Sequence, residues 1–279
     1  MPQEATIARQ TDCAGIGLHS GKMEHLTLKP ANAGTGIVFS RLDLAGSPKI
    51  HVNPINVTAT RRATTLTEDG VSVHTVEHLL SALHAFGIDN CLIEMDGEEP
   101  PATDGSAKVY LDILEAAGRE AQSKTRHEII VDRVFRIDDG ERFIIALPYN
   151  GFRVSFTSIN EHKAIGVEYC DFILKGSMYE QEIAPARTVA YEKEVEELKA
   201  SGLGRGGSLE NVIVYNDNGW LNPLRFENEL ARHKIVDVMG DMRLAGFIKA
   251  HIIAVKSGHA LNTRLAREIY EAYSQNVAH

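Results

Sequence analysis

Two short stretches of the sequence combine histidine and carboxylate residues at the spacing of one helical turn. The stretch HTVEH at 74–78 places two histidines four apart, with Glu77 beside the second. Its letters match the H-x-x-E-H pattern of inverted zinc proteases. The stretch HKIVDVMGD puts His233, Asp237 and Asp241 at positions i, i+4 and i+8, on one stripe of a helix. Imidazole and carboxylate groups are zinc ligands, so both stretches could do metal chemistry.

Neither stretch completes a catalytic zinc site, which needs three protein ligands and an open position. His233 and Asp237 lie one turn apart and could hold one ion together, and the histidines of the first stretch offer the missing ligand. A further histidine, His259, lies in the turn SGHALN, where Asp241 could hold its ring as an imidazolium. These residues predict a metal site shared between two helices.

Three other interpretations stay open on the residues alone. In a protease, His74 and His78 would both bind the metal. In a non-catalytic binding protein, a closed structural site would take Glu77 or His74 as its fourth ligand. The stretches could also be ordinary helices with a solvent-exposed polar face. The apolar residues of the first stretch gather on one side of its predicted helix: Val76, Leu79, Leu80, Leu83 and Phe86.

The bulk properties exclude several classes of protein. The chain has 279 residues and a formal net charge of −9. Nucleic-acid-binding proteins usually carry a basic surface instead, so we expect no nucleic-acid partner. Cys13, Cys91 and Cys170 are odd in number and far apart, so we expect reduced, mostly buried thiols in a cytoplasmic protein. The first residues lack a signal-peptide pattern, and no apolar run approaches the ~18 residues of a transmembrane segment.

A repeated pattern within the sequence indicates two similar halves. Residues 74–117 and 233–273 each begin with a helical pattern at a histidine and end in an amphipathic helix. Between these helices, each has an aromatic residue beside a glycine, then a short apolar strand and a turn. Segments with period-two apolar residues precede both. We therefore predict an α+β fold of two domains, each a mainly antiparallel sheet with two helices, joined near the polar stretch 121–128.

The predicted domains span residues 1–122 and 127–279, and the second contains an insertion. Tyr191, Val195 and Leu198 recur at helical spacing there, followed by a glycine-rich loop and the strand NVIVY. The loop GLGRGG at 202–207 satisfies G-x-G-x-x-G, but it follows a helix and leads to a strand. A dinucleotide site requires the opposite order, so we interpret this loop as the end of a helix.

The sequence resembles the UDP-3-O-acyl-N-acetylglucosamine deacetylases of Gram-negative bacteria, the zinc amidases of lipid A (lipopolysaccharide) biosynthesis. Matching segments follow the family's order over nearly the whole chain: GIGLHSGK, LTLKPA, TGIVF, HTVEHLLSAL, GIDN, PATDGSA, ARTV, GLGRGGSLENVIV, LRFENELARHKIVDVMGD and SGHALN. The resemblance implies two domains with their helices sandwiched between the sheets and an insertion in each domain.

The implied activity is hydrolysis of the 2-acetamido group of UDP-3-O-(3-hydroxyacyl)-N-acetylglucosamine, an early committed step of that pathway. The products are UDP-3-O-acyl-glucosamine and acetate. The expected partner is this UDP-sugar lipid precursor alone, and we expect a cytoplasmic monomer. Zinc is the expected cofactor, although two histidines and a carboxylate also suit Fe²⁺.

The resemblance also implies residue roles. His78, His233 and Asp237 bind the metal, Glu77 is the general base, and His74 is a bystander. His259 is the general acid held by Asp241, Thr188 donates its hydroxyl to the developing oxyanion, and Lys234 lies toward the substrate's phosphates. The insertion at about 188–214 forms the acyl-chain passage, with these expected lining residues: Leu198, Leu203, Leu209, Val212 and Val214. The chain departs from the family near the substrate at Arg61, Arg62 and Val189.

Overall fold

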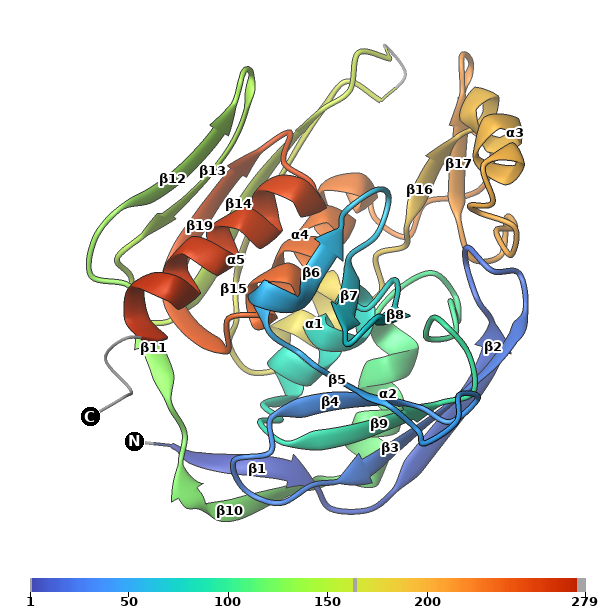
Figure 1. Ribbon diagram of the computed structural model, residues 1–279. Helices are drawn as coiled ribbons and strands as arrows, with labels where there is room; N and C mark the ends of the chain where they lie inside the picture. Colours follow the sequence, from blue (N-terminus) through green and yellow to red (C-terminus); the bar gives the residue numbers. More distant parts are fainter. Residues whose placement is uncertain (1, 163–164, 275–279) are drawn as a thin grey trace.

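Two large sheets form the fold, with helices packed between them (Figure 1). The computed structural model describes residues 2–162 and 165–274. Within them, the first sheet has the spatial order β2 (Thr11–Ile16), β3 (Met23–Pro30), β9 (Cys91–Met95), β4 (Ile37–Arg41) and β5 (Lys49–His51). The second has the order β12 (Phe135–Asp139), β13 (Arg142–Leu147), β19 (Phe247–Val255), β14 (Phe152–Ile159) and β15 (Val167–Ile173), with β11 (Glu128–Ile130) also paired to β19. The predicted α+β class is confirmed.

The two sheets share one strand order. In each sheet, the last strand in chain order lies in the middle. Strand β9 pairs antiparallel with β3 and parallel with β4, and β19 pairs antiparallel with β13 and parallel with β14. Two copies of one unit would have this order, so it supports the predicted repeat. The division of the chain into two domains stays a prediction.

Alternating burial explains why the period-two segments form strands. Leu26 and Leu28 of β3 are fully buried, while the alternate residues His25, Thr27 and Lys29 are exposed or only partly covered. Strand β15 alternates in the same way along its whole length. One face of each strand therefore contacts the helical layer.

The helices fill the space between the sheets (Figure 1). They are α1 (Glu77–Phe86), α2 (Lys108–Ala117), α3 (Glu192–Ala200), α4 (Glu229–Arg243) and α5 (His259–Ser274), with a 3-10 turn at Pro54–Asn56 and a π-helical turn at Tyr179–Ile183. Helices α1 and α2 pack together beside the first sheet, and α4 and α5 pack together beside the second. Helix α1 also packs against α4, which joins the two halves of the molecule. In the described part of the chain, no helix is long and apolar enough to cross a membrane.

The predicted helix starts are wrong on both sides of the site. Helix α1 begins at Glu77 rather than at His74, because Thr75 has a φ of 55°, in the left-handed region that ends helical geometry. Helix α4 begins at Glu229, one turn before the predicted start at His233. Its first residues, Glu-Leu-Ala-Arg, are strong helix formers, so the helix extends toward the N-terminus.

The polar stretch expected to join the domains is largely a strand. Residues 119–125 form β10 (Arg119–Thr125), which pairs antiparallel with β1 (Gln3–Ile7). Most of β10 is exposed. A strand exposed in this way needs no apolar residues, and its polar composition therefore resembled that of a loop.

Each half carries a small three-stranded insertion. The first contains β6 (Val57–Ala59), β7 (Thr65–Glu68) and β8 (Val71–Val73). The second contains β16 (Val189–Tyr191), β17 (Ile213–Asn216) and β18 (Gly219–Trp220), with α3 beside them at one corner of the molecule (Figure 1).

The three cysteines are free thiols, and Cys91 and Cys170 are buried as expected.

Candidate active site

Helices α1 and α4 meet through polar faces that are buried rather than solvent-exposed. A Cβ atom on Gly240 of α4 would lie 2.0 Å from the carbonyl oxygen of Glu77, so the glycine permits a close crossing of the two backbones. The predicted site residues of both helices lie at this crossing, and none is more than 7% exposed: Glu77, His78, His233, Asp237 and Asp241. The interpretation of two ordinary helices with wet polar faces is therefore wrong.

His78, His233 and Asp237 bring one potential ligand atom each to a common point. These atoms lie within 4.8 Å of one another. Oδ1 of Asp237 is 3.6 Å from Nε2 of His78 and 3.4 Å from Nε2 of His233. Two ligands of a tetrahedral zinc ion, each ~2.1 Å from the metal, lie about 3.4 Å apart. The spacing therefore fits a metal ion.

The chemical state of these three groups also fits a cation. Nδ1 of His233 lies 3.1 Å from the carbonyl oxygen of Ala186 and donates its proton there, which leaves the Nε2 lone pair facing Asp237. Burial lowers the pKa of His233 to about 3, so the ring is neutral. Oδ1 of Asp237 is buried and has no hydrogen-bond donor among the described residues. Burial alone would raise the pKa of this carboxyl, but Lys234 and His233 outweigh it and hold the pKa well below its usual range.

A carboxylate and an imidazole stand beside this group. Oε1 of Glu77 is 3.8 Å from Nε2 of His259, and Oε2 of Glu77 accepts a hydrogen bond of 3.0 Å from the backbone N–H of Thr64. Burial raises the pKa of Glu77. This group and His259 also form, with Asp237, a second set of atoms that could hold a cation.

Asp241 contacts His259. Its Oδ2 lies 2.9 Å from Nδ1 of His259 and accepts a second hydrogen bond of 2.9 Å from the Asn262 amide. Its Oδ1 accepts a hydrogen bond of 2.5 Å from the Thr64 hydroxyl. Burial alone would lower the pKa of His259, but Asp241 and Glu77 outweigh it and raise the pKa to about 10. The imidazole is therefore protonated and carries its free N–H toward Glu77.

His74 lies outside the site. Its Nδ1 is 2.9 Å from the Thr65 hydroxyl, and it belongs to neither set of potential ligand atoms found among residues 2–162 and 165–274. The left-handed Thr75 separates it from α1, so the one-turn relation to His78 in the sequence is lost in space. This geometry argues against the protease arrangement.

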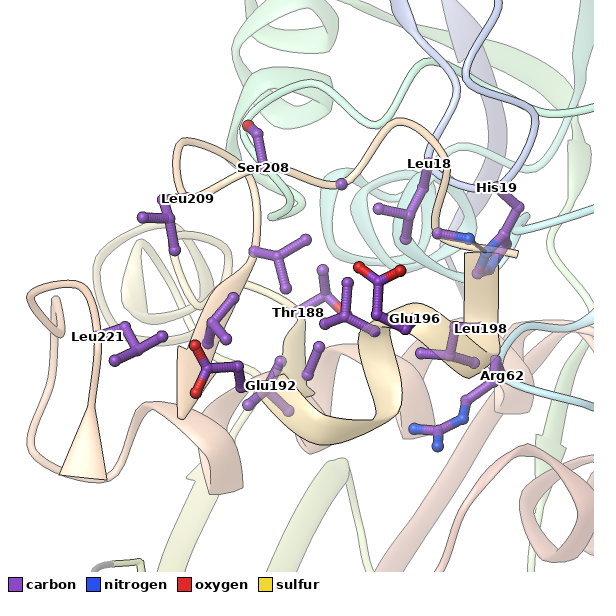
Figure 2. Close-up of a pocket in the computed structure, with 17 residues that line it drawn as sticks. Leu18, His19, Arg62, Thr188, Glu192, Glu196, Leu198, Ser208, Leu209 and Leu221 are labelled. Carbon is purple, nitrogen blue, oxygen red and sulfur yellow. Dashed lines mark hydrogen bonds between the residues drawn. The ribbon is translucent and has the colours of Figure 1, made fainter. Parts of the chain in front are cut away.

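Two adjoining cavities open onto these residues. The polar cavity, of about 400 Å³, is lined by the metal-site residues, Glu77 and His259, and by the cations Arg142, Lys234 and Lys256. The apolar pocket, of about 480 Å³, is lined mainly by the second insertion, with Leu18, His19 and Arg62 from the first half (Figure 2). Four residues line both cavities, and we call them the junction residues: Leu18, Arg62, Thr188 and Val189.

Most of the expected passage residues line the apolar pocket. Leu198, Leu209, Val212 and Val214 do so, and Leu203 is not among its lining residues. Its backbone N–H instead donates to the carbonyl of Leu198, in the turn that ends α3. The sequence analysis missed Leu18, Val195 and Leu221, of which only Val195 carried a signal, as a member of the amphipathic helix.

The sequence analysis also missed the groups that hold the candidate site residues in place. Thr64 contacts both Glu77 and Asp241, yet it comes from the turn before β7, outside both helices and 177 residues from Asp241. The Ala186 carbonyl orients His233 from another loop. Asn262 carried a weak signal, because it follows His259 by three residues at the start of α5.

Comparison with known proteins adds an independent line of argument. Residues 4–271 match the family described as UDP-3-O-acyl N-acetylglycosamine deacetylase. The chain is 40% identical over 269 residues to the UDP-3-O-acyl-N-acetylglucosamine deacetylase of Citrifermentans bemidjiense, covering 95% of this chain and 88% of that protein. It is 42% identical over 268 residues to the enzyme of that name from Thermosynechococcus vestitus, covering 95% and 93%. For the Pasteurella multocida protein the identity is 41% over 275 residues, covering 96% and 90%.

Proposed function

The chain belongs to the UDP-3-O-acyl N-acetylglycosamine deacetylase family, and from this premise we propose how its residues hydrolyse the substrate. It is an amide hydrolase of lipid A biosynthesis, which removes the acetyl group from UDP-3-O-acyl-N-acetylglucosamine. The products are acetate and the free glucosamine amine. One observation carries the residue-level proposal: a buried set of metal-ligand atoms adjoins both a cation-lined cavity and an apolar pocket.

The proposed metal ligands are His78, His233 and Asp237, and zinc is the proposed ion, with Fe²⁺ as the alternative that this ligand set allows. A bound ion of this kind polarises an amide carbonyl and makes water a stronger acid. The neutral ring of His233 and the unpartnered oxygen of Asp237 support this assignment.

Glu77 is the proposed general base. Its Oε2 is fixed by the Thr64 N–H, which leaves Oε1 to take the proton of the attacking water. Burial raises its pKa toward the working pH, where a general base is most effective. A well-placed base contributes ~10²–10⁴ to the rate.

His259 is the proposed general acid. Its Nδ1 is bound to Asp241, so Nε2 is the atom that delivers a proton to the leaving nitrogen. An amine leaves poorly without this proton. The raised pKa keeps His259 protonated at neutral pH, in the state required of an acid.

Thr188 is the proposed donor to the oxyanion. Its backbone N–H donates to the Gly105 carbonyl at 2.9 Å, and its own carbonyl accepts from the Ile213 N–H at 2.8 Å, so the residue is fixed at both ends. The hydroxyl has no hydrogen-bond partner among the described residues and is free to donate. Fixed donors aimed at developing charge stabilise the transition state.

The two cavities suit the two ends of this substrate. Lys234, Lys256 and Arg142 supply positive charge to the polar cavity, where we place the diphosphate. Lys234 also binds Oδ2 of Asp237 at 2.8 Å, which keeps it close to the proposed metal. The acyl chain would occupy the apolar pocket. We expect the enzyme to act as a cytoplasmic monomer.

Acetate release from UDP-3-O-acyl-N-acetylglucosamine, measured with and without a chelator, tests the proposal. We expect turnover that the chelator abolishes and that zinc or iron restores. The Glu77→Ala variant should lose ~10²-fold or more in kcat while it keeps its metal content and Tm. A purified, metal-loaded protein that releases no acetate would refute the proposed function, and a Glu77→Ala variant with near-normal kcat would refute the role of Glu77.

A further inference from the structure

Arg62 occupies an unusual position at the junction of the two cavities. It lies in the turn between β6 and β7 with a φ of 65°, in the left-handed region that non-glycine residues rarely adopt. Such a backbone conformation costs free energy and tends to mark functional positions. Figure 2 shows Arg62 at one side of the apolar pocket near Leu198, while Leu209 and Leu221 lie at the other side.

The contacts of Arg62 leave most of its guanidinium free. Nη2 donates to Oε2 of Glu194 on α3 at 2.6 Å, which joins the first insertion to the second. The two side chains are 45% and 43% exposed, and ion pairs this exposed contribute little to stability. A guanidinium has five N–H donors, and this bond uses one of them. Stability therefore does not explain an arginine here, and an incoming acceptor could replace Glu194.

The covalent structure of the substrate places an acceptor at this point. The acetamido group and the acyl ester are attached to adjacent carbons of the sugar ring. When the amide lies at the proposed metal ligands and the acyl chain lies in the apolar pocket, the ester carbonyl must lie between the two cavities. Of the junction residues, Leu18 and Val189 are apolar and Thr188 serves the amide, so Arg62 is the remaining donor.

We propose that Arg62 is a specificity-determining residue that donates hydrogen bonds to the ester carbonyl at the head of the acyl chain, in exchange for its bond to Glu194. The inference rests on the proposed function. A contact with the diphosphate is the weaker alternative, because Arg62 lines the apolar pocket as well as the polar cavity. The cations Arg142, Lys234 and Lys256 line the polar cavity and are not among the described residues that line that pocket.

Three substrates separate these roles: UDP-3-O-acyl-N-acetylglucosamine, its 3-O-alkyl ether of equal length, and UDP-N-acetylglucosamine. The ether keeps the chain and the diphosphate but lacks the carbonyl. We expect Arg62→Ala to reduce the ratio of kcat/KM for ester over ether about 10- to 100-fold, the effect of losing hydrogen bonds to a charged donor. Most of the change should appear in KM, and Arg62→Lys should restore only part of the ratio, because lysine lacks the planar fork.

The neighbouring residue provides a matched control. Arg61 is exposed and lines neither cavity, so Arg61→Ala removes the same charge and should keep the wild-type ratio. Glu194→Gln should also keep it, whereas a purely structural role of the ion pair predicts the same loss as in Arg62→Ala. Metal content and Tm confirm folding of each variant.

Four results would overturn the inference. An unchanged ratio in Arg62→Ala excludes recognition of the ester. Equal losses of kcat/KM on all three substrates would show that Arg62 binds the diphosphate. An ester-over-ether ratio that falls in Glu194→Gln as it does in Arg62→Ala would show that the effect comes from the ion pair. A wild-type enzyme that releases no acetate from any of the three would overturn the proposed function, and this inference with it.

Discussion

Replacing Gly240 with alanine should separate the two helices that carry the proposed metal ligands and the proposed general base. The added Cβ would lie 2.0 Å from the carbonyl oxygen of Glu77 and 2.7 Å from its carbonyl carbon, and neither backbone atom can turn aside. Ordinary contact begins at about 3.4 Å, so α1 and α4 must move apart by about 1.4 Å, the difference from 2.0 Å. The shift would carry His78 away from His233 and Asp237.

The expected losses are large in activity and moderate in stability. A misplacement of ~1 Å can cost ~10²-fold in rate, so we expect kcat/KM for acetate release to fall by at least that factor. Overpacking of this kind costs ~1–3 kcal/mol in the free energy of unfolding. Metal bound per chain should fall as well, because one proposed ligand comes from α1 and two come from α4.

Helix propensity predicts the opposite result and makes the test decisive. Alanine is ~1 kcal/mol more favourable than glycine inside a helix, so without the contact the variant would be more stable. Gly240→Ser adds one more atom and should be worse than Gly240→Ala. A Gly240→Ala enzyme with a raised Tm, full metal content and wild-type kcat/KM would refute the close crossing of the two helices.

Three further tests address the metal, the proton transfers and the acid stability. His74→Ala should keep its metal while His233→Ala loses most of it, and the reverse pattern would favour the protease arrangement. The kcat/KM should fall at acidic pH as Glu77, with its raised pKa, gains a proton, and at alkaline pH as His259 loses one. A His259→Ala variant that retained the alkaline limb and most of kcat would contradict this assignment. Burial lowers the pKa of His84 from 6.5 to about 3, so the unfolded chain binds the extra proton between these values and stability falls as pH falls through them. In urea unfolding, His84→Phe should remove up to ~1.4 kcal/mol per pH unit of that slope, and an unchanged slope would assign it to other groups.

The sequence predicted best what depends on spacing along the chain. His233 and Asp237 are one turn apart in a long helix, and they keep that relation in the structure. Alternating apolar residues predicted strands such as β3 and β15, because burial of one face sets that period. The same spacing argument failed for His74 and His78, since the left-handed Thr75 prevents α1, which begins at Glu77, from extending back to His74.

Contacts between distant segments could not be predicted from local patterns. The Thr64 hydroxyl and backbone N–H bind Asp241 and Glu77, and no periodicity marks this threonine. The helical wheel separated polar from apolar residues of α1 correctly, but it could not show that α4 covers the polar side. Burial raises the pKa of Glu77, and the carboxylates of Asp241 and Glu77 raise the pKa of His259 against the effect of burial. Both shifts depend on contacts between distant segments, so they could be found only in the tertiary structure.

The position of β19 has a consequence for how the protein is made on the ribosome. Among the described residues this strand is the last, yet it lies between β13 and β14 in the middle of its sheet. Until it emerges, those two strands have unpaired edges with nothing between them, and such edges favour aggregation and chaperone binding. The first sheet, by contrast, closes once β9 (Cys91–Met95) has emerged. His259, the proposed general acid, follows β19 closely at the start of α5, so we expect that a truncated or nascent chain without these elements cannot hydrolyse the substrate.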